Sequence, residues 1–241
     1  MSLTRRALMS AFAASAFIIC PLCRARAAAD HKILCASAGA TEPTGRDILH
    51  TSGDANLDRI LAAEMIAQFS FFSLKPAFMF YAGPDQNAYA TTEIYLQGTQ
   101  GTILYNLGFL KTQLTSTKWG GAVISGVIAH EFGHIYQYYS KYAESLAKLA
   151  KTVKFIELHA DFISGFYMGR KHVKTPLDLN DYFDEFYKLG DYQFESKDHH
   201  GTKEERYFAI KAGYNLALGN SAAGAGFAAA QGETFLKEYF R

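Results

Sequence analysis

Cysteine, net charge and long hydrophobic runs are all scarce in this chain, and each scarcity excludes a class of protein. Only three of the 241 residues are cysteine. Cys20 and Cys23 lie in an N-terminal segment that we expect to be removed, so Cys35 alone cannot form an internal disulfide. The formal net charge is +1, and without a basic patch nothing points to a nucleic-acid partner. The apolar run from Ala7 to Leu22 is too short for a comfortable membrane span.

The N-terminal segment has the three-part layout of an export signal. Arg5 and Arg6 precede the apolar run, and a stretch of small residues follows it, which is the order basic, apolar, cleavage site. The arginine pair resembles twin-arginine signals, which send folded proteins across bacterial inner membranes, although an ordinary secretory signal could also hold two adjacent arginines. We expect a signal peptide over residues 1–29, cleaved after Ala27 or Ala29. The mature protein would be periplasmic or secreted, with no stable membrane span.

The functional interpretation depends on the sequence His-Glu-Phe-Gly-His at residues 130–134. Residues four apart lie on one face of a helix, so His130 and His134 can bind one metal ion together. Glu131 lies about 100° further round the turn, where it can face a metal-bound water without ligating the metal. Two neutral imidazoles suit zinc, which lowers the pKa of its bound water to about 7. The alternative is a pair of core histidines bonded to backbone carbonyls, since the surrounding residues are apolar.

A second apolar stretch supplies a third ligand. Catalytic zinc takes three protein ligands and keeps one position open, and Glu157 is the candidate for the third. Asp161, one helical turn later, can accept the other N–H of a ligating histidine and fix its tautomer. His159 lies between them on another face and is not expected to bind the metal. The two stretches together predict a hydrolytic Zn2+ site.

This combination, HExxH followed by Glu-x-x-Ala-Asp, resembles the gluzincin metallopeptidases. That group includes thermolysin, the neutral zinc metallopeptidases and the heat-shock protease X/CAAX-protease family. The resemblance covers roughly residues 87–213 and implies that Glu157 is the third zinc ligand, supported by Asp161. It implies a mainly helical α+β, zincin-like domain over residues 30–241, with a small antiparallel sheet beside the zinc-binding helix. The implied activity is that of a hydrolase: a protease acting on a peptide or protein, with metal-activated water and Glu131 as general base.

The segment Asn87-Ala88-Tyr89-Ala90 is similar to one that precedes the zinc helix in the heat-shock protease X/CAAX-protease family. There the segment lies along the edge of the active-site cleft. An edge strand can receive an extended peptide through backbone hydrogen bonds, so we expect these four residues to bind substrate. An ordinary edge strand is the alternative.

The segment from His200 to Arg206 is similar to a late segment of the same families. The resemblance implies that these two residues stabilise the oxyanion or hold the ligand shell. The alternative is a turn and a helix start without a catalytic part. His199 is adjacent and could be the better placed histidine.

Two alternative functions would use the same predicted zinc site. A zinc amidase acting on cell-wall peptides would fit the expected export. A zinc-stabilised binding or chaperone-like protein would have no use for a general base, so Glu131 argues against it.

Periodicity and capping signals predict the elements around the site. Residues 30–55 have little periodicity and are expected to form a loosely ordered lead-in. Residues 219–232 contain too many glycines for a helix to be predicted there. Gly133, inside the metal motif, indicates the close approach of another backbone or of substrate. The predicted elements are a helix from Ala55 capped by Asp54, a strand at Lys75–Tyr81, two strands between Asn87 and Leu110, helices at Gly120–Tyr139 and Thr152–Gly169, a helix from Lys203 opened by a Thr202/Glu205 capping box, and a short helix at Glu233–Phe240.

Overall fold

The computed structural model describes residues 33–35, 48–84, 86–116, 118–172, 182–184, 188, 192 and 196–240. These residues belong to one compact unit, His31–Arg241. The expected signal peptide at residues 1–29 lies outside the described residues.

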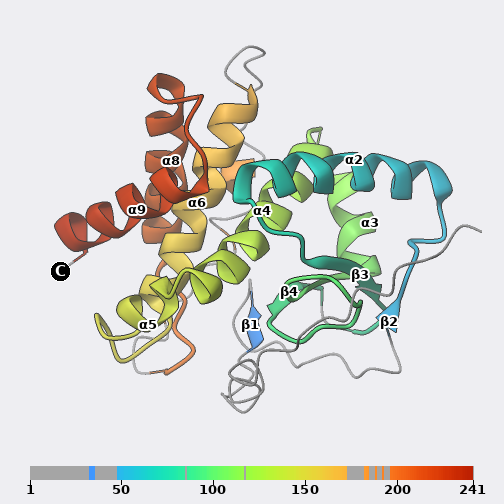
Figure 1. The fold of residues 1–241 in the computed structure, drawn as a ribbon, viewed down its shortest axis with the longest axis horizontal. Coiled ribbons are helices and arrows are strands. Elements are labelled where there is room, and N and C mark those ends of the chain that lie inside the picture. The colour runs from blue at the N-terminus through green and yellow to red at the C-terminus, as the bar shows by residue number, and fades with distance from the viewer. Residues whose placement is uncertain are drawn as a thin grey trace, which may run out of the picture. The chain divides into compact units, whose positions relative to one another are not determined.

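Helices predominate in the described part of the chain, and a small sheet accompanies them, which makes the fold α+β (Figure 1). The elements in chain order are β1 (Ile33–Cys35), β2 (Ile48–Leu49), α2 (Ala55–Phe72), β3 (Ala77–Tyr81), β4 (Ala88–Thr91), β5 (Thr102–Asn106), α3 (Leu107–Ser116), α4 (Gly120–Tyr139), α5 (Tyr142–Leu146), α6 (Lys154–His172), α8 (Lys203–Gly219) and α9 (Ala225–Tyr239).

Local signals set several of these boundaries as predicted. The side chain of Asp54 accepts hydrogen bonds from the first backbone N–H groups of α2 and so caps that helix. Thr202 and Glu205 form the reciprocal capping box at the start of α8. The metal motif lies on α4, whose observed bounds are those predicted from the sequence.

The sheet is mixed, so the prediction of an antiparallel sheet is wrong for one pair of strands. Its strand order is β1-β4-β5-β3-β2. β3 and β5 run parallel, with Ala77 opposite Thr102, while the other pairs are antiparallel. After β3 the chain does not form the neighbouring strand but crosses to β4, and β5 then fills the place between β4 and β3. Because β5 returns antiparallel to β4, it has the same direction as β3.

The lead-in at residues 30–55 contributes two strands that the sequence did not indicate. β1 pairs with β4, with Leu34 opposite Ala90, and β2 pairs with β3, with Ile48 opposite Tyr81. Both therefore lie at the edges of the sheet. Such pairing uses backbone N–H and C=O groups, which any sequence possesses, so it left no hydrophobic periodicity to detect.

Helix α4 is the centre of the fold because nearly all of its surface is covered. Its buried residues extend round the whole helix from Gly120 to Gln137, which is typical of a helix enclosed on all sides. It packs against α6 and α3 and against β4, and Figure 1 shows it between the sheet and the group formed by α6, α8 and α9. The metal motif is thus placed at the boundary between the sheet and this helical group.

Helices α6 and α8 pack with their backbones in contact, and glycines make this possible. A Cβ on Gly165 would lie 1.9 Å from the carbonyl oxygen of Ile210, and a Cβ on Gly213 would lie 2.0 Å from that of Phe162. Neither backbone oxygen can move without displacing its helix. These glycines therefore fix how close α8, which carries Arg206, comes to α6, which carries Glu157.

Replacing Gly213 by Ala is expected to destabilise the fold. The added Cβ overpacks the α6–α8 contact, which typically costs about 1–3 kcal/mol and sometimes more. The matched control is Gly219→Ala at the end of the same helix, where a Cβ would meet nothing within 4 Å. Urea unfolding would measure both variants. Equal stability of the two would contradict the close packing of α6 and α8.

The C-terminal helix is longer than predicted. α9 begins at Ala225 rather than near Glu233. Small buried residues in its first half, among them Ala229 and Gly232, face α6, and a Cβ on Gly232 would lie 3.1 Å from a ring carbon of His159. Glycine lowers helix propensity, but packing against a neighbouring helix supplies most helical stability, and here it does so.

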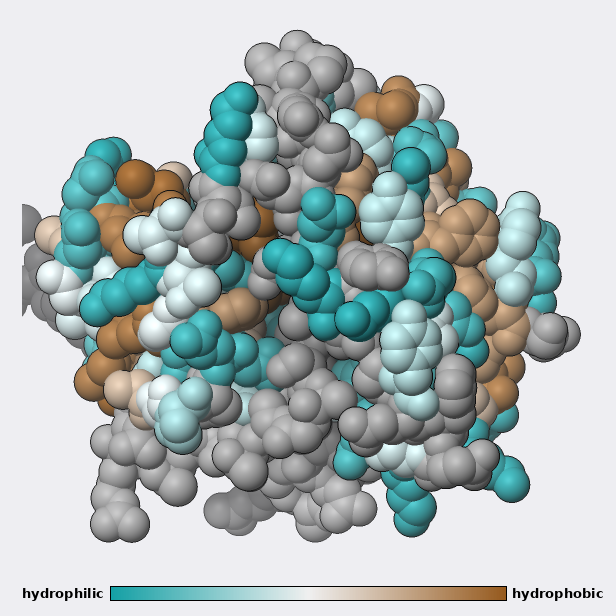
Figure 2. All heavy atoms as spheres, turned by 180° about the vertical axis from the view of Figure 1, so that it is seen from behind, coloured by the Kyte–Doolittle hydropathy of each residue, from teal (hydrophilic) through white to brown (hydrophobic). Residues whose placement is uncertain are grey.

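The surface mixes polar and apolar side chains, as Figure 2 shows for the face opposite to that of Figure 1. Large apolar side chains that are exposed include Ile60, Ile66, Ile94, Leu96 and Tyr239. Within the described ranges, none of the helices combines the length and the hydropathy needed to cross a membrane.

Candidate metal centre

Two facing helices bring together three side chains that could hold a metal ion. α4 provides His130 and His134, whose Nε2 atoms lie 3.0 Å apart, because residues four apart share a helix face. α6 provides Glu157, whose Oε2 lies 3.4 Å from Nε2 of His130 and whose Oε1 lies 3.4 Å from Nε2 of His134. The approach of the helices is permitted by Gly133, since a Cβ there would lie 3.2 Å from Cα of Ala160. The close backbone approach expected at this glycine is confirmed.

These distances fit a metal ion. A tetrahedral zinc with bonds of about 2.0–2.1 Å separates its ligand atoms by about 3.3–3.4 Å. The two Nε2 atoms lie 3.0 Å apart, and each has one oxygen of Glu157 at 3.4 Å, Oε2 for His130 and Oε1 for His134. His130, His134 and Glu157 are close enough to hold one ion. Among the described residues, no second group of His, Cys, Asp or Glu side chains is arranged in this way.

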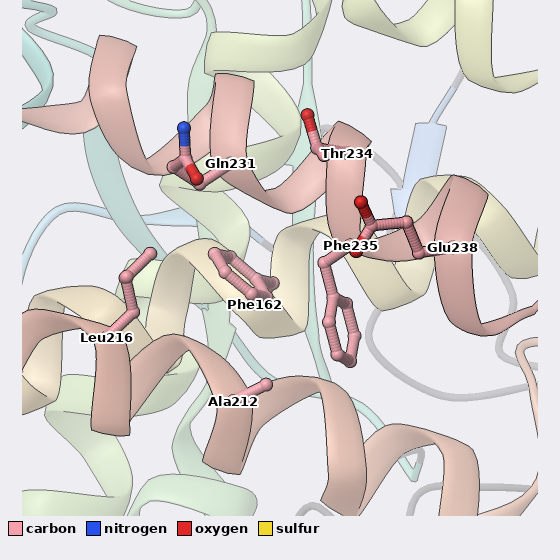
Figure 3. Close-up of a pocket in the computed structure, with 7 residues that line it drawn as sticks. All are labelled: Phe162, Ala212, Leu216, Gln231, Thr234, Phe235 and Glu238. Atoms are coloured by element: carbon pink, nitrogen blue, oxygen red, sulfur yellow. The ribbon is translucent and has the colours of Figure 1, made fainter.

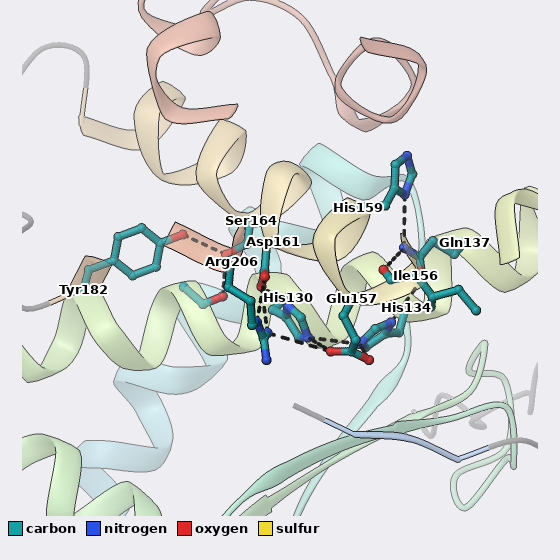
Figure 4. A network of polar contacts seen from close by, with 11 residues as sticks. His130, His134, Gln137, Ile156, Glu157, His159, Asp161, Ser164, Tyr182 and Arg206 are labelled. Carbon is teal, nitrogen blue, oxygen red and sulfur yellow. Dashed lines mark hydrogen bonds and ion pairs between the residues drawn. The ribbon is translucent and has the colours of Figure 1, made fainter. Parts of the chain in front are cut away.

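His130 is held by a carboxylate on α6, as predicted for Asp161. Its Nδ1 lies 2.9 Å from Oδ1 of Asp161. Arg206, on α8, donates from Nε and from one terminal nitrogen to the two oxygens of the same carboxylate, both at 2.8 Å. All three side chains are buried. Because Nδ1 of His130 donates to Asp161, its Nε2 is directed to Glu157 and to Nε2 of His134 (Figure 4). The point between these three side chains is called the metal position below.

His134 is held by a different partner, which the sequence analysis missed. Its Nδ1 lies 3.1 Å from Oε1 of Gln137, and Nε2 of Gln137 donates to the carbonyl oxygen of Ile156 and to Nδ1 of His159. A signal for this contact did exist. Gln137 follows His134 by three residues, so the two are neighbours on the helix, and a polar residue among apolar ones needs a partner.

In the metal-free site, the carboxylate of Glu157 faces one protonated and one neutral histidine. Burial opposes the charge on Glu157, but the positive charges of the neighbouring histidines and a hydrogen bond from His130 hold the pKa of its carboxyl well below the usual range. Burial also opposes a charge on His130, yet its hydrogen bonds to Asp161 and Glu157 raise the pKa to about 9. Burial lowers the pKa of His134 to about 4. His130 must therefore lose a proton before its Nε2 can bind a metal, because only a neutral imidazole is a ligand. After that loss, one carboxylate and two imidazoles form a donor set that suits zinc.

Glu131 differs from Glu157 although both are buried carboxyl groups. Neither of its carboxylate oxygens has a hydrogen-bond partner within the described parts of the chain. Burial raises the pKa of Glu131 to about 8. A buried polar group without a partner is costly, so this carboxyl group requires a partner from outside the described residues, such as a water, a proton or a substrate. Two nearby carboxyl groups with opposite pKa shifts can take different chemical roles.

Arg206 and His200 are the two residues expected to stabilise the oxyanion or to hold the ligand shell. Arg206 is fully buried and engaged by both oxygens of Asp161, with Glu157 3.7 Å away. These contacts are with the ligand shell, which is one of the two roles expected for Arg206. His199 and His200 are both buried, and the charge of His200 contributes to the low pKa of Glu157. His200 therefore lies near that ligand, and its catalytic role stays a prediction.

The expected substrate strip is not at the edge of the sheet. Asn87 is buried, and Ala88, Tyr89 and Ala90 lie on β4, which packs against α4. β4 pairs with β5 on one side and with β1 on the other. The prediction of an edge strand is therefore wrong, because β1 already occupies the backbone groups that a peptide would use. A peptide could bind here only in exchange for β1.

A separate pocket lies among α6, α8 and α9, with a volume of about 200 Å³ (Figure 3). Its lining is mostly apolar, and Glu238 is the charged residue in it. It holds none of the metal-binding side chains. The residues around it are Phe162, Ala212, Leu216, Gln231, Thr234, Phe235 and Glu238.

No protein-family model matches this chain, and neither a curated protein nor a solved structure matches it significantly.

Proposed function

We propose that this protein is a zinc-dependent peptidase of the gluzincin type, with a zincin-like fold. The observation that carries the proposal is the buried carboxyl group of Glu131, which has no hydrogen-bond partner among the described residues and adjoins His130 in the chain. A site that only stabilises the fold gains nothing from such a group, whereas hydrolysis needs a general base. The neighbouring group of His130, His134 and Glu157 supplies the ligands.

In this proposal the chain's own residues divide the work. His130, His134 and Glu157 would hold zinc, which supplies a water of lowered pKa and polarises the substrate carbonyl. Glu131 takes a proton from the attacking water and returns it to the leaving amine. Asp161 and Arg206 keep His130 in place. His200 is the candidate for stabilising the oxyanion, since it lies near Glu157.

Location and substrate class follow from less direct observations. Export to the periplasm or secretion rests on the signal layout of residues 1–29 alone. A peptide or protein substrate rests on the resemblance of the two motifs to gluzincins, and a cell-wall amidase uses the same chemistry on another amide.

One observation favours a non-catalytic alternative. His130, His134 and Glu157 are all buried, with Glu157 only 1% exposed, and a structural zinc needs no access for a substrate. In a zinc-stabilised binding protein, metal removal would unfold the chain. In the peptidase, the zinc-free protein would stay folded.

Replacing Glu131 by Gln should abolish hydrolysis while leaving zinc content unchanged. The amide keeps the shape of the side chain but cannot accept the proton, and loss of general-base catalysis typically costs roughly 100- to 10,000-fold in rate. The assay is mass spectrometry of new peptide termini after zinc-loaded protein is incubated with a complex peptide mixture, so no substrate needs to be known in advance.

The control for this test is Glu144→Gln, at an exposed position on α5. Its rate should equal that of the wild type. Cleavage by Glu131→Gln at the wild-type rate would refute the mechanism. If neither the wild type nor Glu144→Gln cleaved any peptide, the non-catalytic alternative would be favoured.

A further inference from the structure

A chain of buried hydrogen bonds leads from the candidate ligand His134 to the C-terminal helix. His134 Nδ1 lies 3.1 Å from Gln137 Oε1, and Gln137 Nε2 lies 3.0 Å from His159 Nδ1. His159 Nε2 lies 2.9 Å from the carbonyl oxygen of Ala229 on α9. Figure 4 shows these side chains in sequence, with His159 on the far side of Gln137 from the metal position.

The chemistry of the partners fixes the direction of each hydrogen bond. The carbonyl of Ala229 can only accept, so Nε2 of His159 carries a proton and its Nδ1 is the acceptor in the neutral ring. The amide of Gln137 is oriented by the carbonyl of Ile156, 2.7 Å from Nε2. Nε2 of Gln137 therefore donates to His159. Its Oε1 is left to accept, and the donor is Nδ1–H of His134.

The tautomer of His134 follows from this order. With the proton on Nδ1, the lone pair on Nε2 points to the metal position, where Nε2 of His130 and an oxygen of Glu157 also converge. The two histidine ligands are thus held by unlike partners. His130 donates to a carboxylate, whereas His134 donates to a neutral amide that is itself oriented from two sides.

We infer that Gln137 and His159 are positioning residues that fix the tautomer and the ring orientation of His134, and that α9 contributes to metal binding through them. The inference rests on the metal site of the proposed function. His134, Gln137 and His159 are all fully buried, so water cannot readily replace a lost partner. Residues that orient metal ligands in this way typically contribute roughly 10- to 100-fold in metal affinity.

The first test compares the zinc affinity of three variants by competition with a chelator. Gln137→Met keeps the length of the side chain and removes both hydrogen-bonding groups, so its Kd for zinc should rise roughly 10- to 100-fold. Gln137→Glu keeps an acceptor for His134 but loses the donor to Ile156 and His159, so its Kd should lie between those of Gln137→Met and the wild type. Gln113→Met makes the same change at another buried glutamine, outside the site, and should leave the Kd unchanged.

The second test reads the tautomers directly, by long-range ¹H–¹⁵N correlation spectra of zinc-free protein labelled at histidine. In the wild type, His134 should carry its proton on Nδ1 and His159 on Nε2. Gln137→Met should change these tautomer populations, which a purely structural role of Gln137 would leave as they are. This measurement needs no catalytic activity, and the wild-type spectrum alone is informative if the Met variant does not fold.

Two outcomes would overturn the inference. One is a zinc Kd of Gln137→Met equal to that of the wild type, or changed no more than in Gln113→Met. The other is a wild-type His134 protonated on Nε2. A wild-type protein that binds no zinc would instead overturn the proposed function, and the tautomers would still decide on the hydrogen-bond chain.

Discussion

Zinc content should fall from about one ion per chain in wild-type residues 30–241 to a small fraction of that in Glu157→Ala. The substitution removes the only carboxylate of the three-residue group and leaves the two imidazoles of His130 and His134. Loss of a direct ligand is expected to cost more than the roughly 10- to 100-fold that loss of a supporting residue costs. Elemental analysis of the purified proteins after dialysis against metal-free buffer measures the effect.

The control variant and the wild type show how the zinc content of Glu157→Ala is to be interpreted. Glu144→Ala makes the same substitution at an exposed position on α5 and should retain the wild-type zinc content. Unchanged zinc in Glu157→Ala would mean that Glu157 is not a ligand. Zinc absent from every variant, wild type included, would mean that the His-Glu-Phe-Gly-His sequence of α4 binds no zinc.

Replacing Arg206 by Met should destabilise the zinc-free fold by about 3–5 kcal/mol. Arg206 and Asp161 are both fully buried and joined by two hydrogen bonds of 2.8 Å. Removing the guanidinium leaves the buried carboxylate of Asp161 with His130 as its remaining partner, and a buried charge that loses a partner costs more than the contact itself. Urea unfolding in the presence of a chelator measures the change without a contribution from metal binding.

A double variant separates the buried charge from other effects of the substitution. Arg206→Met combined with Asp161→Asn should be less destabilised than Arg206→Met alone, because no unpaired charge remains and the amide oxygen can still accept from His130. Arg59→Met, at an exposed position on α2, should change stability by less than about 0.5 kcal/mol. If the double variant were the least stable of the three, the ion pair would not be the reason for the loss.

Local patterns in the sequence were sufficient for the parts of the protein in which neighbouring residues interact. The bounds of α4, the Asp54 cap and the Thr202/Glu205 capping box all depend on contacts within one or two helical turns. The pairing of His130 and His134 belongs to the same class, since one helix places both rings. Glu157 was predicted from its own apolar helix, and the packing of α6 on α4 brings it to the histidines.

Contacts between distant segments were decided by the tertiary structure. The parallel pairing of β3 with β5 and the cover of β4 by β1 depend on backbone hydrogen bonds, which leave no side-chain pattern. Two roles were predicted for Arg206, the oxyanion or the ligand shell, and its contacts are those of the second. It is a buried partner of Asp161 because α8 approaches α6 closely enough for the side chain to be enclosed.

By itself, the sequence determined which residues could form a zinc site, because helical periodicity and the chemistry of imidazole and carboxylate are properties of short segments. Only the tertiary structure decided how those residues are held. The partner of His134 is a glutamine oriented by Ile156 and His159, and His159 in turn contacts Ala229, 70 residues further along the chain. Such a chain of hydrogen bonds exists only when α4, α6 and α9 are packed together. The bond between His134 and Gln137 lies within α4, but the others require atoms from different helices to lie within about 3 Å.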